Sequence, residues 1–105
     1  MPELSGKQKR YLRGLAHHLD PVVHVGGAGL SDALIAKTSA ELDNHELIKV
    51  KVGENSPLER GEVGPRLAEA TGAALVQILG KMVVLYRPRE EEAGSSAPPG
   101  IELPE

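Results

Sequence analysis

A short glycine-rich segment, Gly26-Gly27-Ala28-Gly29 followed by Leu30 and Ser31, is the strongest candidate for binding a ligand. Glycine permits positive φ and lets a ligand approach the backbone closely. Ser31 is a good N-cap, and the helix that it would open offers free amides and the positive end of its dipole. Both features favour binding of a phosphate. A GxxG sequence is also common in simple tight turns, so the surrounding chain has to decide between the two.

The histidines do not form a metal-binding pattern, and the chain has no Cys, which excludes thiolate sites and disulfides. His17 and His18 would point about 100° apart on a helix, and no HExxH pair is present. His24 and His45 are therefore expected to be structural or surface residues. The sequence also lacks a GxSxG motif, a P-loop and a paired-carboxylate pattern, so we expect neither a catalytic set nor a cofactor.

A basic face is predicted for the first helix. Ser5 can cap a helix that runs to about His18, and no acid occurs from Ser5 to Leu19. At about 100° per residue, one arc becomes an apolar stripe that we expect to be buried, made of Leu4, Tyr11, Leu12, Leu15 and Leu19. The bases on the remaining surface are Lys7, Lys9, Arg10 and Arg13. An ordinary solvated helix face has a similar pattern, so charge alone does not identify a partner.

Two strands flank the glycine segment and its helix. The β-branched run 22–25 predicts the first strand. The helix is predicted from Ser31 to about Asn44, and its apolar stripe consists of Leu34, Ile35, Thr38 and Leu42. Residues 46–52 alternate as a strand, with Ile48, Val50 and Val52 on one side and Leu47, Lys49 and Lys51 on the other. One face of this strand is therefore partly basic.

A third helix and a hairpin complete the predicted elements. Ser56-Pro57-Leu58-Glu59 has capping-box spacing, and Gly72 fits a helix end. Because Gly61, Gly64 and Pro65 interrupt the middle, we expect a kinked or late-starting helix that is firm only over 65–71. Residues 74–79 and 82–87 predict strands joined by the two-residue loop Gly80-Lys81. The order α-β-α-β-α-β-β predicts an α/β domain with a four-stranded mixed sheet.

The sequence divides into a body, residues 1–89, and a segment 90–105 rich in Glu, Pro, Gly and Ser. We expect this segment to be a disordered tail, because it has too little apolar surface to offset its ordering entropy. The body contains all 12 Lys and Arg against 10 Asp and Glu, whereas the tail contains 5 Glu and no base. The body is therefore mildly basic, although the whole chain has a net charge of -3.

Length and composition limit the class of protein. A chain of 105 residues supports one domain, and no apolar run approaches the roughly 18 residues needed to span a bilayer. We expect a soluble, cytoplasmic monomer without a membrane partner. The aromatic residues are two tyrosines, which weighs against recognition of single strands by rows of stacked aromatic rings.

Three longer stretches carry a resemblance to a known family: LSGKQKRYLRGLAHHLDPVVHVGGAGLS, HELIKVKV and VQILGKMVVLYRPR. They span about Leu4 to Arg89 and closely resemble the bacterial single-domain members of the CRM (YhbY-like) family. The resemblance implies a fold similar to the C-terminal domain of bacterial translation initiation factor three. It also implies binding to RNA and association with precursors of the large ribosomal subunit; related domains in organelles act in intron splicing.

By position, the family's RNA-contacting loop corresponds to residues 26–31, with Ser31 where Thr is more usual, and its basic first helix corresponds to the four bases named above. Asp20 stands where Lys is common, which would weaken the basic surface beside the loop. We add Lys49 and Lys51 to the expected RNA-binding residues because they share one strand face. The alternative is a protein-interaction module that reaches the ribosome through protein partners.

The acidic tail lies outside the resemblance. Glu90, Glu91 and Glu92 follow the last strand closely enough to reach basic surface within a Debye length of about 8 to 10 Å. Truncation after Arg89 is expected to tighten RNA binding at low salt if these acids compete with RNA, and to leave it unchanged if the tail only aids solubility.

Overall fold

The computed structural model describes residues 4–88 and 103–104. Its elements follow the predicted order, and their bounds are α1 (Gly6–Ala16), β1 (Pro21–Val25), α2 (Asp32–His45), β2 (Leu47–Val52), α3 (Arg60–Thr71), β3 (Ala74–Leu79) and β4 (Met82–Tyr86). The predicted α/β class is confirmed.

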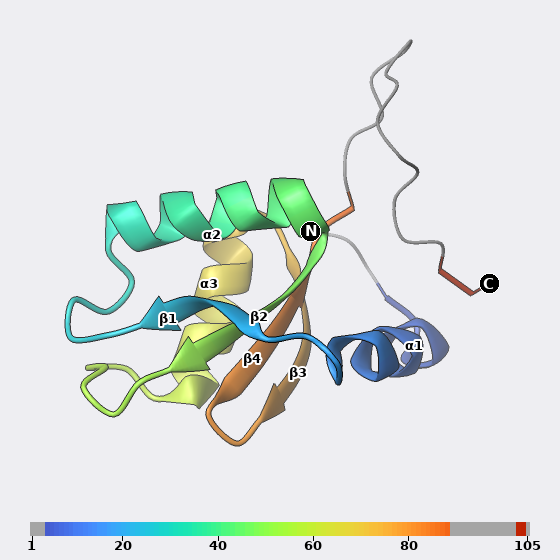
Figure 1. Ribbon diagram of the computed structural model, residues 1–105, viewed down its shortest axis with the longest axis horizontal. Coiled ribbons are helices and arrows are strands. Elements are labelled where there is room, and N and C mark those ends of the chain that lie inside the picture. Colours follow the sequence, from blue (N-terminus) through green and yellow to red (C-terminus); the bar gives the residue numbers. More distant parts are fainter. Residues whose placement is uncertain (1–3, 89–102, 105) are drawn as a thin grey trace, which may run out of the picture.

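The four strands form one mixed sheet in the order β1-β2-β4-β3. β1 and β2 are parallel because α2 crosses between them, and β4 is antiparallel to both β2 and β3. The carboxyl ends of β1, β2 and β3 therefore meet at one end of the sheet, which carries the β1–α2 loop, the β2–α3 loop and the β3–β4 turn (Figure 1). A backbone bond from Val52 N to Lys81 O, 2.8 Å long, joins the last two of these.

The main core lies between one face of the sheet and the pair α2 and α3. Alternate strand residues such as Val23, Val50 and Val83 point into it and are fully buried. Leu42 from α2 and Leu67 from α3 close it from the helix side. We call this covered face the inner face of the sheet and the opposite one the outer face.

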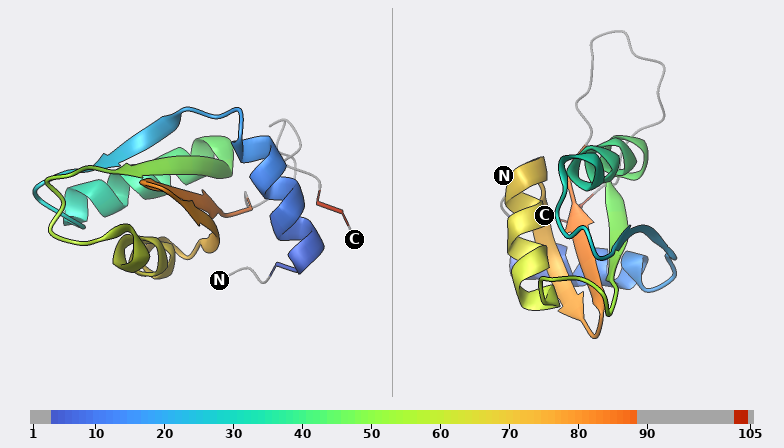
Figure 2. Two further views of the ribbon diagram at one scale, coloured as in Figure 1. Left: turned by 90° about the horizontal axis from the view of Figure 1, so that it is seen from below. Right: turned by 90° about the vertical axis from the view of Figure 1, so that its left-hand side faces the viewer.

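α1 lies apart from the other helices, at the end of the sheet opposite the three loops (Figures 1 and 2). Its buried residues, Leu12 and Ala16, pack in a second cluster with Leu47, Val84 and Tyr86 from the strands. The predicted Ser5 cap is present as a capping box: Gln8 N donates to Ser5 Oγ at 3.1 Å, and Ser5 N donates to Gln8 Oε1 at 3.0 Å.

The predicted burial of the α1 stripe is wrong in part. Leu12 is buried and Leu4 is half-buried, but Tyr11, Leu15 and Leu19 are 43%, 38% and 37% exposed. The physical reason is that α1 packs mainly on one side, against the outer face near one end of the sheet, and Tyr11, Leu15 and Leu19 fall largely outside this contact. Such a site covers a narrower arc than the amphipathic pattern offers.

The prediction for the third helix is wrong in two respects. α3 runs without interruption from Arg60, and the hydroxyl of Ser56 bonds to the backbone of Leu58 instead of capping it. Gly64 allows close packing on the sheet, because a Cβ there would lie 3.1 Å from Leu75 Cδ1. Burial of the neighbouring helix face offsets the low helix propensity of Gly64 and Pro65. The predicted αL end at Gly72 is confirmed, with φ 69°.

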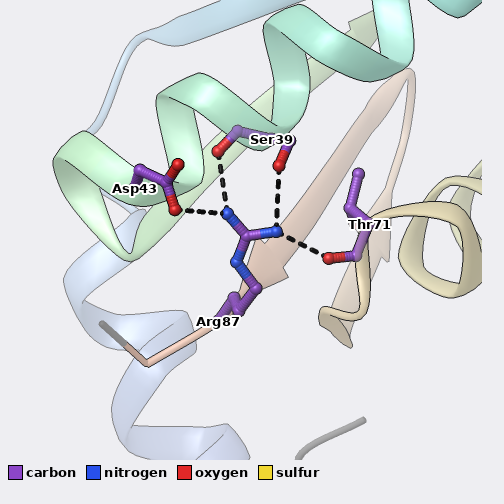
Figure 3. A network of polar contacts seen from close by, with 4 residues as sticks. All are labelled: Ser39, Asp43, Thr71 and Arg87. Carbon is purple, nitrogen blue, oxygen red and sulfur yellow. Dashed lines mark hydrogen bonds and ion pairs between the residues drawn. The ribbon is translucent and has the colours of Figure 1, made fainter. Parts of the chain in front are cut away.

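Arg87, just after β4, ties the two covering helices to the sheet (Figure 3). Its Nη1 donates to Thr71 O at 2.6 Å and to Ser39 Oγ at 3.1 Å. Its Nη2 donates to Ser39 O at 2.8 Å and to Asp43 Oδ1 at 2.7 Å. This guanidinium joins the end of α3 to the middle of α2, so Arg87 belongs to the scaffold.

Part of the segment 90–105 contacts the domain. Leu103 is half-buried against the second cluster, and Gln8 Nε2 donates to Pro104 O at 3.1 Å. The prediction of a disordered tail and the position of Glu90, Glu91 and Glu92 otherwise lie outside the described residues.

Candidate nucleic-acid interface

The predicted glycine segment forms a tight turn between β1 and α2. Gly29 N donates to Gly26 O at 3.0 Å, which closes the turn, and Gly29 has φ 63°. Gly26, Gly27 and Ala28 are exposed, whereas Gly29 is buried. The turn therefore presents mainly backbone, with the Ala28 methyl group, to the solvent at the loop end of the sheet.

The glycines of this turn have different structural roles. Gly29 needs its left-handed backbone, and a Cβ there would lie 3.0 Å from Pro57 Cγ, so the fold itself requires glycine. At Gly26 an added Cβ would meet nothing within 4 Å, and at Gly27 it would make an ordinary contact at 3.9 Å with Asn55 O. Gly26 and Gly27 are thus not required by packing.

The β2–α3 loop packs against the turn, a contact that no sequence pattern predicted. Gly53 N donates to Val25 O at 2.9 Å, next to the turn, and Pro57 lies against Gly29. On its other side the same loop is joined to the β3–β4 turn by an ion pair between Glu54 Oε1 and Lys81 Nζ, 3.0 Å apart. Lys81 lowers the pKa of Glu54, mainly through this hydrogen bond and to a smaller extent through its positive charge.

The start of α2 completes the anion-binding features of the turn. Ser31 Oγ accepts from Leu34 N at 3.2 Å, which confirms the predicted cap, and the first backbone bond of the helix runs from Ile35 N to Ser31 O at 3.0 Å. Asp32 and Ala33 come before that bond, in the first turn of α2, where backbone N–H groups have no acceptor within the helix. These amides and the helix dipole favour an anion near the GGAG turn.

The basic residues predicted for the site are spread along the domain instead of clustered beside the turn. Lys7, Arg10 and Arg13 are exposed on α1 and Lys9 is half-buried there, at the far end of the sheet. Asp20 precedes β1 and the turn follows it, so the expectation that Asp20 weakens the surface beside the loop is wrong. The physical reason is that β1 is extended, so the residue before it and the turn after it lie at opposite ends of the strand.

The outer face of the sheet lies between the GGAG turn and the basic helix α1, and it carries further basic residues. Lys51 is exposed and Lys49 is half-buried on β2, as their alternation with buried residues predicts. His24 is directly opposite Lys51 in the parallel pair β1–β2 and is exposed, two residues before the turn. Its position as the single polar residue of an apolar strand is the signal in the sequence, although that signal alone predicts only a structural or surface role.

Within residues 4–88 and 103–104, no group of three or more His, Asp or Glu could hold a metal ion. In the same described part of the chain, no helix is both long and apolar enough to cross a membrane.

The sequence is similar to those of known proteins. Residues 4–87 match the CRS1/YhbY (CRM) domain. The chain is 47% identical over 91 residues to an RNA-binding protein of Haemophilus influenzae, covering 87% of this chain and 92% of that protein. It is 41% identical over 88 residues to the probable RNA-binding protein YqeI of Bacillus subtilis, covering 84% of this chain and 92% of that protein.

A solved structure has the same fold. The solution structure of a Staphylococcus aureus protein, described as a candidate RNA-binding protein, matches with a TM-score of 0.74 and 43% sequence identity, covering 97% of this chain and 100% of that chain. The resemblance found in the sequence is therefore confirmed. Since the family match spans most of the chain and its relatives match over nearly their whole length, this chain belongs to the CRS1/YhbY (CRM) domain family.

Proposed function

We propose that this protein binds RNA, with the exposed backbone of the GGAG turn in contact with phosphates. The observation that carries the proposal is that Gly26 and Gly27 are exposed beside the start of α2 although packing requires glycine at neither position. Glycine there leaves backbone amides bare for a ligand, and the helix N-terminus favours an anion. The relatives named as RNA-binding proteins support RNA as that ligand.

The spacing of the basic residues supports a ligand longer than one nucleotide. The turn and α1 lie at opposite ends of β1, which has five residues and, at about 3.3 Å per residue, is roughly 16 Å long. A single phosphate cannot touch both ends. An RNA strand that does so passes the outer face, where Lys51 and Lys49 add positive charge.

The experiment that tests the turn is the substitution Ala28→Asp, with Ala28→Asn as the matched neutral control. A carboxylate at this exposed position should repel a bound phosphate by at least roughly 1 kcal/mol, the value for unit charges about 4 Å apart in water, and so weaken binding about fivefold or more. An acid near a helix N-terminus does not destabilise the free protein.

Fluorescence anisotropy with a labelled structured RNA at low salt measures the affinity, and thermal unfolding measures stability. Ala28→Asn should bind nearly as the unaltered protein does. If Ala28→Asp folds and binds RNA as tightly as Ala28→Asn, the turn is only a chain reversal and its assignment as a phosphate site is wrong.

We further propose that the RNA is ribosomal RNA in precursors of the large subunit and that the protein acts there as a cytoplasmic monomer without catalytic activity. The resemblance to single-domain CRM proteins supports this finer assignment, because residue chemistry does not distinguish one structured RNA from another. A backbone-reading surface suits a folded RNA whose shape is recognised.

A protein-interaction role is the second candidate, and one observation favours it. An apolar groove at the end of the sheet farthest from the loops is lined by Leu15, Leu19, Val22, Leu47 and Ile48, with Asp20 and His45 at its sides. Contact between apolar surfaces survives high salt, whereas binding through phosphates weakens as salt rises. The salt dependence of association with ribosomal particles therefore separates the two functions.

A further inference from the structure

We call Leu103 and Pro104 the 103–104 anchor, because they contact the basic helix α1 and the cluster on which this helix packs. Leu103 packs against the cluster that contains the two buried residues of α1, Leu12 and Ala16. Pro104 O accepts a hydrogen bond from Gln8 Nε2 at 3.1 Å. The same side-chain amide accepts from Ser5 N at 3.0 Å through Oε1. One glutamine therefore joins the N-terminal cap of α1 to the anchor.

α1 is held in place by its packing against β2, β3 and β4 and by the 103–104 anchor. It is 11 residues long, and isolated helices shorter than about 12 to 15 residues are marginal in water, so packing decides whether it forms. It lies outside the layer of α2 and α3, at the end of the sheet (Figure 2). Only a narrow stripe of α1 is covered by the sheet, and Leu103 and Pro104 add an apolar contact with the same cluster and a hydrogen bond to this packing.

We infer that the 103–104 anchor positions α1 for RNA binding. This inference rests on the proposed function, because it assumes that Lys9, Arg10 and Arg13 contact RNA. The anchor lies outside residues 4–87, the region that matches the family, so the match assigns it no role. Without the anchor, a smaller fraction of molecules holds α1 on the sheet, and the apparent dissociation constant rises in inverse proportion to that fraction.

Positioning of α1 by the anchor and competition by the acidic segment predict opposite changes in RNA affinity when the segment is released. Residues 90–105 carry five Glu and no base, so a segment that merely competed with RNA would weaken binding, and its release would tighten binding. A segment that positions α1 would strengthen binding, and its release would weaken it. The two effects are separated by changing Leu103, which carries no charge.

The test uses the full chain with Leu103→Ser, and with Leu103→Met as the conservative control that keeps an apolar side chain of similar volume. Amide hydrogen exchange of α1, compared with α2 and α3, reports whether the helix loosens by itself. If the competent fraction falls to about a fifth, the dissociation constant for RNA rises about fivefold. Leu103→Met should restore both values.

A further variant shows whether Leu103 acts through α1. Lys9, Arg10 and Arg13 are changed together to Gln, with and without Leu103→Ser. Once these charges are gone, loosening α1 should cost no additional affinity, so the two changes should be non-additive. Combination with Ala28→Asp should instead be additive, because the turn lies at the other end of the sheet.

The inference is overturned if Leu103→Ser leaves α1 exchange and RNA affinity unchanged, if it tightens binding, or if its effect adds fully to that of the three Gln substitutions. Failure of the proposed function has a different signature. In that case the three Gln substitutions do not alter RNA binding, while faster exchange of α1 in Leu103→Ser still reports the anchor.

Discussion

At the scale of single residues, two glycines of the GGAG turn have different roles. Gly29 has φ 63° and lies against Pro57, so the backbone and the packing both demand it. Gly26 has free space around it and no positive φ, and its missing side chain exposes the chain to a ligand. The first glycine maintains the turn, and the second is available for recognition.

The pair Gly26→Ala and Gly29→Ala tests this division. Gly26→Ala should fold with a free energy of unfolding within about 0.5 kcal/mol of the unaltered protein. If its methyl group blocks one charge-assisted hydrogen bond of about 1.5 kcal/mol, RNA affinity should fall roughly tenfold. Gly29→Ala should lose about 1 to 2 kcal/mol of stability, the cost of a left-handed backbone for alanine.

Chemical denaturation and RNA titration of the two variants provide the measurement. A stable Gly26→Ala variant with unchanged affinity would show that no ligand approaches the backbone there. An equally stable Gly29→Ala variant would contradict the structural role of that position.

The basic residues show how far one sequence position can be interpreted alone. Arg87 and Arg13 look equivalent in the sequence, yet the guanidinium of Arg87 bonds to Ser39, Asp43 and Thr71, whereas Arg13 is exposed. The partners of Arg87 come from α2 and α3, far away in the chain. Local pattern therefore could not assign Arg87 to the scaffold.

At the scale of elements, α1 carries the largest local concentration of positive charge. Four bases occur in its first eight residues, and no acid occurs from Ser5 to Leu19. Since charged residues on an exposed helix face contribute little to stability, these bases are available for a ligand. α2 and α3, which cover the inner face, also carry exposed bases, Lys37 and Arg66.

We expect the change of Lys9, Arg10 and Arg13 to Gln to weaken RNA binding and to make its salt dependence shallower. If all three contact phosphates, the slope should fall by about 2 to 3 log units of affinity per log unit of salt, at 0.7 to 0.9 for each contact. Stability should change little, because the residues lie on the surface of α1.

The charge-matched control changes Lys37 and Arg66 to Gln and is compared with the double variant Arg10→Gln, Arg13→Gln, which removes the same number of charges. It also removes positive charge from exposed helix positions but does so on the helices that cover the inner face. Its effect on the salt slope should be close to zero. Equal slopes for the two variants would mean that only net charge matters and that α1 has no special part in binding.

The sequence predicted the caps of α1 and α2 correctly but not the extent of α3. The caps at Ser5 and Ser31 are local hydrogen bonds that need a few consecutive residues, so the sequence predicted them correctly. The continuity of α3 through Gly64 depends on contact with Leu75 and Ile78 in β3, which follows later in the chain. Propensity is a weak prior when tertiary packing of this kind opposes it.

At the scale of the whole molecule, the proposed contacts form one elongated surface from the GGAG turn over the outer face to α1. A surface of this length suits a large folded RNA better than a free nucleotide. Large-subunit precursors are the ligand we propose, which leads to a prediction for the protein in cells.

We expect the protein to sediment with immature large-subunit particles rather than with translating ribosomes. Gradient fractionation followed by immunoblotting measures its distribution, and the Ala28→Asp variant should move to the unbound fractions. Raising the salt before centrifugation should release the protein if phosphates hold it. Equal recovery from polysomes and precursors would contradict the prediction.

Local sequence patterns correctly predicted the element order, the two serine caps, the hairpin at Gly80-Lys81 and the alternation that exposes Lys51. These features arise from hydrogen bonds and periodicities that span a few residues, so each leaves a local signature. The glycine turn and its place before α2 were predictable for the same reason.

How these parts lie relative to one another depends on the tertiary structure. It placed α1 at the far end of the sheet from the turn, put Pro57 against Gly29, and brought Pro104 into contact with Gln8 of α1. Each of these is a contact between residues remote in sequence, formed because the strands fix a common direction and the apolar faces must be covered. The sequence encodes such contacts only through the packing of the whole chain, so no short pattern reveals them.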